Sequence, residues 1–271
     1  MTLIAQISDA HIKAPGKLAY GRVDTAAALA RAVDTVNALD PQPDLVVISG
    51  DLVDGGGAEE YAHLRDLLVP LRAPLRAVPG NHDLRGPLRA ALSARCALAP
   101  GEGPVDWVED LPDARVVGLD SSVAGGAHGM LQETSLALLE RALAERPDVP
   151  VLIVLHHPPV RLNIPEMDDD NLRNAEALGE LVRPHGARAA IACGHLHRTA
   201  STVFAGALLT IAPGLSHAVL RTAEPPTRFA MEPPGYVLHG LIDGAWTAET
   251  CPTGTFDGPY PFRDAEGGFI D

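Results

Sequence analysis

Basic charge, and lysine in particular, is scarce in this chain. Only Lys13 and Lys17 are lysines among its 21 basic residues, and 35 acidic residues leave a formal net charge of -14. Proteins that hold duplex nucleic acid do so through many Lys and Arg contacts to phosphates. The composition therefore argues against a nucleic-acid duplex as partner. A phosphate-bearing substrate would need a local positive centre, which bound metal ions supply.

Cysteine and long apolar runs are also lacking. Cys96, Cys193 and Cys251 show no paired spacing, which favours free thiols in a reducing compartment. No apolar run approaches the roughly 18 residues that span a bilayer. The first residues, which reach Asp9 early, lack the basic region of a signal peptide. We therefore expect a cytoplasmic protein with no membrane partner.

Apolar residues, in contrast, are plentiful at 46% of 271 residues. This length and composition suit one α/β domain with a large core. We predict a single domain over residues 1–271. Its tail, from about 251 to 271, is rich in Gly, Pro and aromatic residues, and we expect it to cap the domain or to make contacts in an oligomer.

Short apolar runs alternate with segments of helical periodicity, which indicates an α/β fold. We predict strands over residues 3–7, 45–48, 75–78, 105–108, 115–119, 151–155 and 189–192. We predict helices that begin at Asp24 as N-cap and after Gly57, and others over 87–94, 133–145 and 172–182. We expect a polar loop over 161–171. Near the end, a second, mostly antiparallel sheet is predicted over 201–204, 208–212, 236–242 and 246–250.

Five predicted strands end in residues that bind metals or transfer protons. These endings are Asp9-Ala10-His11, Gly50-Asp51, Gly80-Asn81-His82-Asp83, His156-His157 and Gly194-His195-Leu196-His197. In open α/β sheets, sites form at the carboxyl ends of the strands. We therefore expect these side chains to meet at one edge of the fold.

The residue types in these endings indicate a transition-metal site. Mixed carboxylate and imidazole ligands suit Fe, Mn, Co and Zn better than Ca. Asp51 has enough lone pairs to bridge two cations. Two such ions about 3.5–4 Å apart clamp a phosphoryl group and generate hydroxide near neutral pH.

Other functional motifs are absent or weak. Ser121-Ser122 is not part of a G-x-S-x-G elbow, which argues against a serine hydrolase. Gly55-Gly56-Gly57 is not followed by the Lys-Ser/Thr of a phosphate-binding loop, which argues against a nucleotide triphosphatase. We expect Asp168-Asp169-Asp170 to be a solvated loop. We expect the histidines outside the five endings to lie at the surface or in loops, namely His63, His128, His185 and His239.

The order D-x-H, GD, GNHD, HHPP, GHLH resembles the signature of the calcineurin-like metallophosphoesterases, and it covers Asp9 to His197. Finer features resemble the bacterial glycerophosphodiesterases grouped with class III cyclic nucleotide phosphodiesterases. They are Tyr20-Gly21-x-x-Asp24, Glu59-Glu60-Tyr61, Asp120-Ser121-Ser122, and Pro213-Gly214 followed by His217. The resemblance implies a four-layer α/β/β/α sandwich, with two mixed sheets flanked by helices, and a dinuclear site.

Carried over residue by residue, the resemblance implies two metal ions, each one of Fe, Mn, Zn or Co. One is held by Asp9, His11 and His197, and the other by Asn81, His156 and His195. Asp51 bridges them. His82 contacts the phosphate or helps the leaving oxygen, and His157 lies behind the ligands at most. In some relatives a cysteine near Asp54 pairs with one in the tail, but this chain has no cysteine near Asp54.

The implied reaction is hydrolysis of a small phosphodiester to a monoester and an alcohol, by attack of a hydroxide held between the metals. A glycerophosphodiester and a 3',5'-cyclic nucleotide are competing substrates. A catalytically inactive binding module is the alternative from another class, but such proteins lose ligand histidines. We expect Tyr20, His217 and part of the loop around His128 to contact the substrate, together with Asn81 and His82. A homo-oligomer, a dimer or higher, is also expected.

Overall fold

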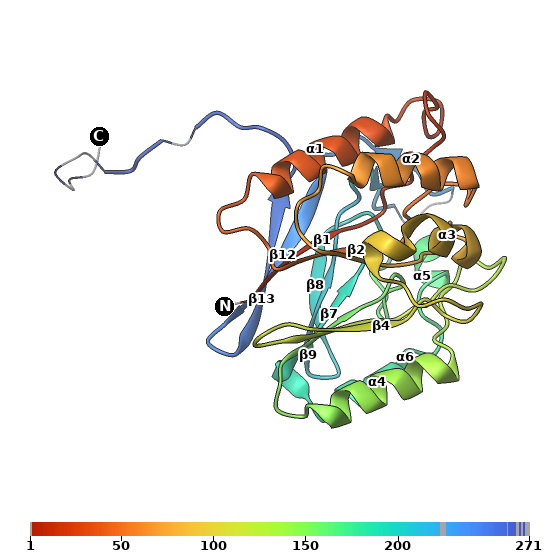
Figure 1. Cartoon of the computed structure of the whole chain (residues 1–271), viewed down its shortest axis with the longest axis vertical. Helices are drawn as coiled ribbons and strands as arrows, with labels where there is room; N and C mark the ends of the chain where they lie inside the picture. The colour runs from red at the N-terminus through yellow and green to blue at the C-terminus, as the bar shows by residue number, and fades with distance from the viewer. Residues whose placement is uncertain (1, 223–225, 259, 264–265, 267, 269–271) are drawn as a thin grey trace.

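The computed structural model describes residues 2–222, 226–258, 260–263, 266 and 268. Its helices and strands form four layers, with two sheets face to face in the middle (Figure 1). Helices α1 (Thr25–Asn37), α2 (Ala58–Leu68) and α3 (Arg85–Cys96) cover one side. Helices α4 (Glu133–Glu145) and α6 (Ala175–Val182) cover the other. The predicted α/β/β/α sandwich is therefore confirmed.

The first sheet has the order β13-β12-β1-β2-β3. Strands β1 (Thr2–Ile7), β2 (Leu45–Ser49) and β3 (Leu75–Val78) are parallel to one another. Strand β12 (Gly235–Ile242) pairs antiparallel with β1 on one side and with β13 (Ala245–Pro252) on the other. β2 is buried along its whole length, as its continuous apolar run predicts. The three parallel strands end at the same edge of the sheet.

The second sheet has the order β4-β5-β6-β7-β9-β8. It contains β4 (Trp107–Asp110), β5 (Arg115–Gly118), β6 (Val151–Val154), β7 (Ala189–Cys193), β8 (Ala200–Phe204) and β9 (Ala207–Ile211). β5, β6, β7 and β9 run parallel to one another. A small two-stranded ribbon, β10 (Ala218–Val219) with β11 (Phe229–Ala230), stands apart from both large sheets.

The prediction of a separate antiparallel sheet near the end of the chain was wrong. β8 and β9 complete the second sheet beside β7, and β12 and β13 complete the first beside β1. The strands themselves were correctly located, but pairing partners depend on contacts between residues far apart in the sequence. Here each pair of late strands extends an existing sheet, so that β13 and β8 become edge strands of the two sheets.

The helices follow the predicted periodicity. α1 is capped by Asp24, whose carboxylate accepts a 2.9 Å hydrogen bond from the Ala27 amide. Its apolar face, which includes Leu29, Val33 and Val36, is fully buried. The third helix is longer than the predicted range 87–94, and 3₁₀ helix η1 (Gly186–Arg188) follows α6. Among the described helices, none is both long and apolar enough to cross a bilayer.

The expected polar loop at 161–171 contains a short helix, α5 (Pro165–Asp169). Asp168 is not solvated, because its carboxylate accepts hydrogen bonds from the amides of Leu162 (2.8 Å) and Ile164 (3.0 Å). The aspartate thus satisfies amide groups at the start of the helix, a local role that the run of three aspartates concealed.

The prediction for His239 was also wrong. It lies in the middle of β12 and is 1% exposed. Its Nε2 is 2.8 Å from Oε1 of Gln6. His63, His128 and His185 are all partly exposed, as predicted. His239 differs because β12 faces the second sheet, a position that its local sequence does not reveal.

Candidate dinuclear metal centre

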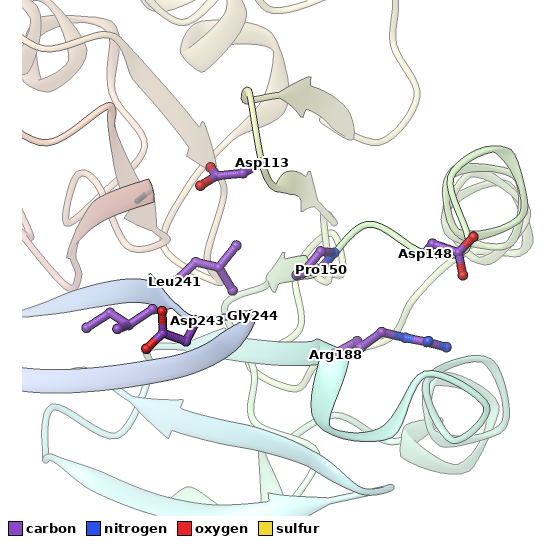
Figure 2. Close-up of a pocket in the computed structure, with 8 residues that line it drawn as sticks. Asp113, Asp148, Pro150, Arg188, Leu241, Asp243 and Gly244 are labelled. Atoms are coloured by element: carbon purple, nitrogen blue, oxygen red, sulfur yellow. The ribbon is translucent and has the colours of Figure 1, made fainter.

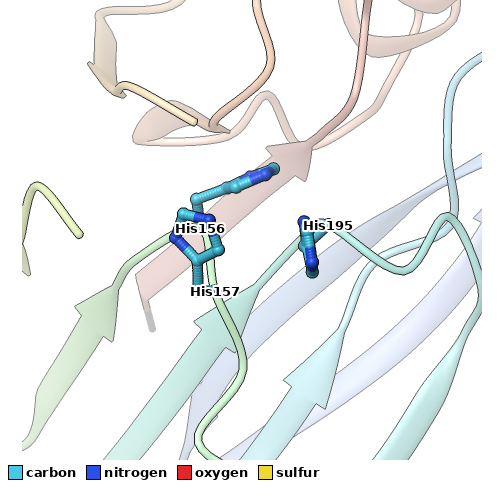
Figure 3. Close-up of side chains that lie close together, drawn as sticks. All are labelled: His156, His157 and His195. Atoms are coloured by element: carbon cyan, nitrogen blue, oxygen red, sulfur yellow. The ribbon is translucent and has the colours of Figure 1, made fainter. Parts of the chain in front are cut away.

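The carboxyl ends of five strands converge between the two sheets. The endings of β1, β2 and β3 contribute Asp9, His11, Asp51 and Asn81, and those of β6 and β7 contribute His156, His195 and His197. Asp9, His11, Asp51, His156, His195 and His197 are all at most 6% exposed. Figure 3 shows His156 and His195 at the ends of neighbouring strands. The structure therefore brings together the seven residues that the sequence analysis selected.

One group within this cluster consists of Asp9, His11, Asp51 and His197. A ligand atom from each lies within 4.8 Å of those from the others. Nε2 of His11 is 3.1 Å from Nε2 of His197 and 3.5 Å from Oδ2 of Asp51. Nε2 of His197 is 3.4 Å from Oδ1 of Asp9. These spacings suit ligands that converge on one small cation.

The second group shares Asp51 with the first. Nε2 of His156 is 3.4 Å from Oδ2 of Asp51 and 3.2 Å from Oδ1 of Asn81. The imidazole rings of His156 and His195 lie 5.2 Å apart. Because Oδ2 of Asp51 is near both His11 and His156, its carboxylate stands between the two groups.

The Nδ1 atoms of His11 and His197 face hydrogen-bond acceptors, which leaves their Nε2 atoms available to a cation. Nδ1 of His11 donates to Asp54 (3.2 Å), and Nδ1 of His197 faces the His217 carbonyl at 3.4 Å. In the neutral rings, the two Nε2 atoms then meet lone pair to lone pair at 3.1 Å. Nε2 of His195 and Oδ2 of Asp9 are buried without a hydrogen-bond partner. Such groups are costly unless an ion satisfies them, so the donor set fits bound metal.

The pKa values report a negative field at the same place. Burial lowers the pKa of His156, but the neighbouring Asp51 and Asp9 carboxylates outweigh it and raise the pKa to about 9. Burial raises the pKa of Asp51, yet His156 and His11 hold it well below its usual range. Burial lowers the pKa of His195 and His197 to about 3. The carboxylates therefore favour a positive charge here, while two imidazoles stay neutral and free to bind metal.

The backbone is strained where these side chains begin. Asp9, His11, Asp51, His195 and His197 all have positive φ, between 46° and 73°. Residues with a side chain rarely adopt this conformation, and a cluster of them is typical of functional sites. Gly50 precedes Asp51 and Gly80 precedes Asn81, because neither position has room for a side chain. A Cβ on Gly50 would lie 2.3 Å from Nδ1 of His156, and one on Gly80 would lie 2.2 Å from Oδ1 of Asp51.

His82 lies beside the cluster without joining either group. Its Nδ1 donates to the Asp54 carbonyl at 2.7 Å, which leaves Nε2 as the free ring nitrogen. The ring packs edge-on against His11, with 4.7 Å between centroids. Its amide donates to Oδ1 of Asp51 (3.0 Å). The side chain is half-buried and lines the adjoining cavity.

His157 follows His156 directly, but its ring nitrogens do not face the two metal-binding groups. Its Nδ1 lies 2.8 Å from the Ser121 hydroxyl and its Nε2 lies 3.1 Å from the Ala127 carbonyl. The carbonyl can only accept, so Nε2 carries the proton and Ser121 donates to Nδ1. His157 is near His156 and His195 (Figure 3), but both of its ring nitrogens are already in use.

A cavity of about 280 Å³ opens over the cluster. Tyr20 and His217 line it, as expected from the sequence, together with Ala127 from the loop around His128. Phe229 on β11 also lines it, and its ring lies 5.0 Å from that of Tyr20 and 5.2 Å from that of His217. We call these three rings the aromatic wall. Sequence reasoning missed Phe229, because the irregular segment around it carries no periodic pattern.

Sequence reasoning also missed Asp54, which lies three residues after Asp51. Its carboxylate accepts from His11 (3.2 Å) and from Lys13 (2.8 Å). Burial raises the pKa of a carboxyl, but here the hydrogen bond from His11, the largest influence, and that from Lys13 keep the pKa of Asp54 far below its usual range. Asp54 thus orients His11 through its side chain and His82 through its carbonyl.

A larger cavity, of about 690 Å³, lies at the opposite end of the strands (Figure 2). It is lined by the β12–β13 turn at Asp243 and by exposed residues that precede β5, β6 and β7, among them Asp113, Asp148 and Arg188. None of the metal-binding clusters in the described residues lies there. The site therefore occupies the smaller cavity.

Buried carboxylates and imidazoles at the carboxyl ends of parallel strands, in a two-sheet sandwich, define the class of metal-dependent phosphoester hydrolases. The chain belongs to the calcineurin-like phosphoesterase family, whose sequence profile matches residues 2–199. It is 37% identical to a protein of Arcobacter nitrofigilis named "Probable glycerophosphodiester phosphodiesterase GpdQ", over 99% of this chain and 100% of the relative.

Two further proteins are similar. A 3',5'-cyclic adenosine monophosphate phosphodiesterase of Pseudomonas aeruginosa is 35% identical over 72% of this chain and 70% of the relative. Among solved structures, a dimetal phosphatase from Danio rerio has a TM-score of 0.65 at 15% identity, covering 93% of this chain and 99% of that one. The similarity to the Danio rerio structure concerns the fold alone.

Proposed function

We propose that the protein hydrolyses a small phosphodiester, of the glycerophosphodiester kind, to a monoester and an alcohol, using two metal ions. The observation that carries this proposal is the shared carboxylate of Asp51, whose Oδ2 lies 3.5 Å from one imidazole group and 3.4 Å from the other. Two ions held this way would neutralise the phosphate oxygens and lower the pKa of the attacking water.

We assign one metal to Asp9, His11 and His197 and the other to Asn81, His156 and His195, with Asp51 as the bridge. The close approach of Nε2 of His11 to Nε2 of His197, and of Nε2 of His156 to the oxygens of Asp51 and Asn81, supports this division. The carboxylate-and-imidazole donor set suits Fe, Mn, Zn or Co.

His82 acts on the substrate rather than on the metals. Its Nδ1 proton is held by the Asp54 carbonyl, so in the imidazolium form the second proton is on Nε2, which donates it to a phosphate oxygen or transfers it to the departing alkoxide. A proton delivered to the alkoxide avoids the release of a strongly basic leaving group. The half-buried position of His82, beside His11 and on the wall of the cavity, supports this role.

The aromatic wall of Tyr20, His217 and Phe229 holds the alcohol part of the diester. It lines the same cavity as His82 and Asp51, so a substrate whose phosphate meets the metals extends against these rings. The cavity of about 280 Å³ suits a small diester. Asn81 and His82 contact the phosphate end.

A 3',5'-cyclic nucleotide is the second candidate substrate, favoured by the likeness to the cyclic AMP phosphodiesterase. The glycerophosphodiester remains first because the likeness to the glycerophosphodiester phosphodiesterase extends over 99% of the chain, against 72%.

A kinetic comparison tests the proposal. Protein stripped of metal is reloaded with Mn²⁺, Zn²⁺ or Co²⁺ and assayed on a glycerophosphodiester, 3',5'-cyclic AMP and bis(p-nitrophenyl) phosphate. We expect activity to return with about two ions per chain and kcat/KM to be highest for the glycerophosphodiester. Hydrolysis without metal, or none of the three diesters cleaved at two ions per chain, would contradict the proposal.

We also propose that the single domain forms a homo-oligomer through its tail. Phe256, Tyr260 and Phe262 are 62%, 71% and 86% exposed, and the described part of the tail extends away from the body of the molecule (Figure 1). Exposed aromatic side chains in one segment favour contact with another chain. Residues 259, 264, 265, 267 and 269–271 lie outside the described part of this tail. Light scattering of the full chain and of one ending at residue 254 tests this role.

Free thiols at Cys96, Cys193 and Cys251 suit a reducing compartment, and we propose a cytoplasmic location. Fractionation of cells that express the protein would test it.

A further inference from the structure

A row of polar side chains crosses the apolar space between the two sheets and ends at the metal centre. It consists of His239, Gln6, Ser49 and Ser8, which we call the polar row. All four are at most 1% exposed. The strand register explains their alignment, because Gln6 lies on β1, Ser8 directly follows β1, and Ile7 between them pairs with Ile48 on β2. The four side chains therefore lie on the face that meets the second sheet.

Each neighbouring pair in the polar row is within hydrogen-bond distance. Oε1 of Gln6 is 2.8 Å from Nε2 of His239, and Nε2 of Gln6 is 2.8 Å from Oγ of Ser49. The same Nε2 is 2.8 Å from the Cys193 carbonyl on β7. Oγ of Ser49 is 2.8 Å from Oγ of Ser8. The row thus joins β12, β1 and β2 to a strand of the other sheet.

The Cys193 carbonyl fixes the direction of every hydrogen bond in the row. A carbonyl can only accept, so the amide nitrogen of Gln6 must face it, and Oε1 must face His239. His239 then donates from Nε2. Burial lowers the pKa of His239 to about 4, so the ring is neutral and keeps that proton at physiological pH.

The same logic continues to Ser8. The second proton of the Gln6 amide goes to Oγ of Ser49, so the Ser49 hydroxyl donates onward to Oγ of Ser8. The Ser8 proton then has two acceptors to choose from. The Ser49 carbonyl is 3.4 Å away, a long distance for an O–H donor. The other acceptor is the Asp9 carboxylate, which as a charged group accepts more strongly.

Asp9 has one carboxylate oxygen that can accept this proton. Its Oδ1 accepts the His195 amide at 3.1 Å, but Oδ2 is buried without a hydrogen-bond partner. A Cβ placed on Gly194 would lie 2.0 Å from Oγ of Ser8 and 2.9 Å from Oδ2 of Asp9. The serine hydroxyl and the carboxylate oxygen therefore share one small space. An oxygen with two lone pairs can take a metal with one and the serine proton with the other.

We propose that Gln6, Ser49 and Ser8 are positioning residues, which direct the Ser8 hydroxyl to Asp9 and thereby set the affinity of the metal ion that Asp9 holds. This inference rests on the proposed function in taking Asp9 as a metal ligand. Groups that hydrogen-bond to a ligand typically change metal affinity about 10- to 100-fold when they are removed. Ser49 also acts through its carbonyl, which accepts Nδ1–H of His156 at 2.8 Å and fixes that ligand's tautomer.

The test measures metal binding directly. Metal-free wild type and the variants Ser8→Ala, Ser49→Ala, Gln6→Met and Ser8→Ala/Gln6→Met are titrated with Co²⁺, followed by calorimetry and visible absorption. Thr210→Val is the matched control, because Thr210 is 2% exposed and its hydroxyl has no partner. Melting temperatures of the metal-free proteins report folding.

We expect Ser8→Ala and Ser49→Ala to weaken one of the two Co²⁺ sites about tenfold and to leave the other within about threefold. Gln6→Met should weaken the same site. The double variant should bind like Ser8→Ala alone, since Gln6 acts through Ser8. Thr210→Val should match wild type, and Ser8→Thr, which restores a hydroxyl, should recover most of the affinity.

Unchanged Co²⁺ binding in Ser8→Ala and Ser49→Ala would overturn the inference, as would additive losses in the double variant. If Gln6→Met does not fold, Ser8→Ala and Ser49→Ala decide alone. A wild type that takes up fewer than two Co²⁺ ions would instead contradict the proposed function. The two failures are therefore distinguishable.

Discussion

The two ends of the parallel strands carry two cavities of different size and chemistry. The cavity at the amino ends is the larger, about 690 Å³ against 280 Å³, and its charged residues are exposed. The cavity at the carboxyl ends is smaller, but its floor is made of buried carboxylates and imidazoles on strained backbone. Water screens and satisfies exposed charges, whereas buried ones require a partner. Buried polar groups without hydrogen-bond partners, rather than cavity volume, therefore distinguish the end that carries the candidate site.

The largest expected effect comes from Asp51, which the two metal groups share. Asp51→Asn should lower kcat about 10³-fold or more, the scale of losing an electrostatic group from a reactive site, because both ions lose a negative ligand. Steady-state assays and metal analysis check this. Asn81→Ala should mainly reduce occupancy of one ion, and wild-type rates with two ions retained in both variants would refute the bridge.

His82→Ala should separate chemistry from metal binding at the same end. We expect about a 10²-fold loss of kcat with a poor alkyl leaving group, and a much smaller loss with p-nitrophenol, which leaves without a proton. Metal content should stay at the wild-type value. Equal losses on both substrates would indicate simple phosphate binding, and full activity on both would exclude His82 from the reaction.

Because it is buried, His239 should make the free energy of unfolding depend on pH, an effect that an exposed histidine with an ordinary pKa would not produce. Its pKa is about 4 in the folded protein against 6.5 unfolded, because it is buried. Between these values the unfolded chain binds more protons, so stability is present above pH 6.5 and lost as pH falls to 4, by up to about 3 kcal/mol. His239→Gln, which keeps a donor for Gln6, should lack this loss.

Urea unfolding of metal-free wild type and His239→Gln at pH 7, 5.5 and 4 checks the prediction. Parallel profiles would show that His239 is not the titrating group, since all other acid effects are common to the two proteins.

The aromatic wall should contribute a smaller effect. Phe229→Ala should raise KM about fivefold for the preferred diester, the scale of about 1 kcal/mol for a lost ring contact, with kcat changed less than twofold. Val69→Ala, at a 73% exposed position with no proposed role, serves as control. A fall in kcat without a change in KM would show that Phe229 supports the metals rather than the substrate.

The smallest effect is expected at the opposite end. Asp243→Asn, beside the larger cavity, should change kcat/KM by less than about twofold, because exposed charges far from the reaction contribute little. Assays under the conditions used for Asp51→Asn check this. A large loss would show that the amino-end cavity takes part in the reaction and would remove the contrast between the two ends.

The sequence by itself determined the elements and most of the candidate site. Continuous apolar runs such as residues 45–48 form buried strands for local reasons, and residues at the ends of parallel strands lie at a common edge of the sheet. For this reason the selected seven residues could be named before any contact was known. Tyr20 and His217 beside them were named from the family resemblance alone.

Only the tertiary structure decided what depends on pairing between distant segments. The sequence pattern of β12 does not say that it pairs with β1, and so it could not show that His239 reaches Gln6. Phe229 joins Tyr20 across about 200 residues, with no periodic signal near it. The hydrogen-bond direction in the polar row depends on a carbonyl from the other sheet. Side-chain periodicity reports which face is buried, but the packing of the two sheets selects the partner that each buried group meets.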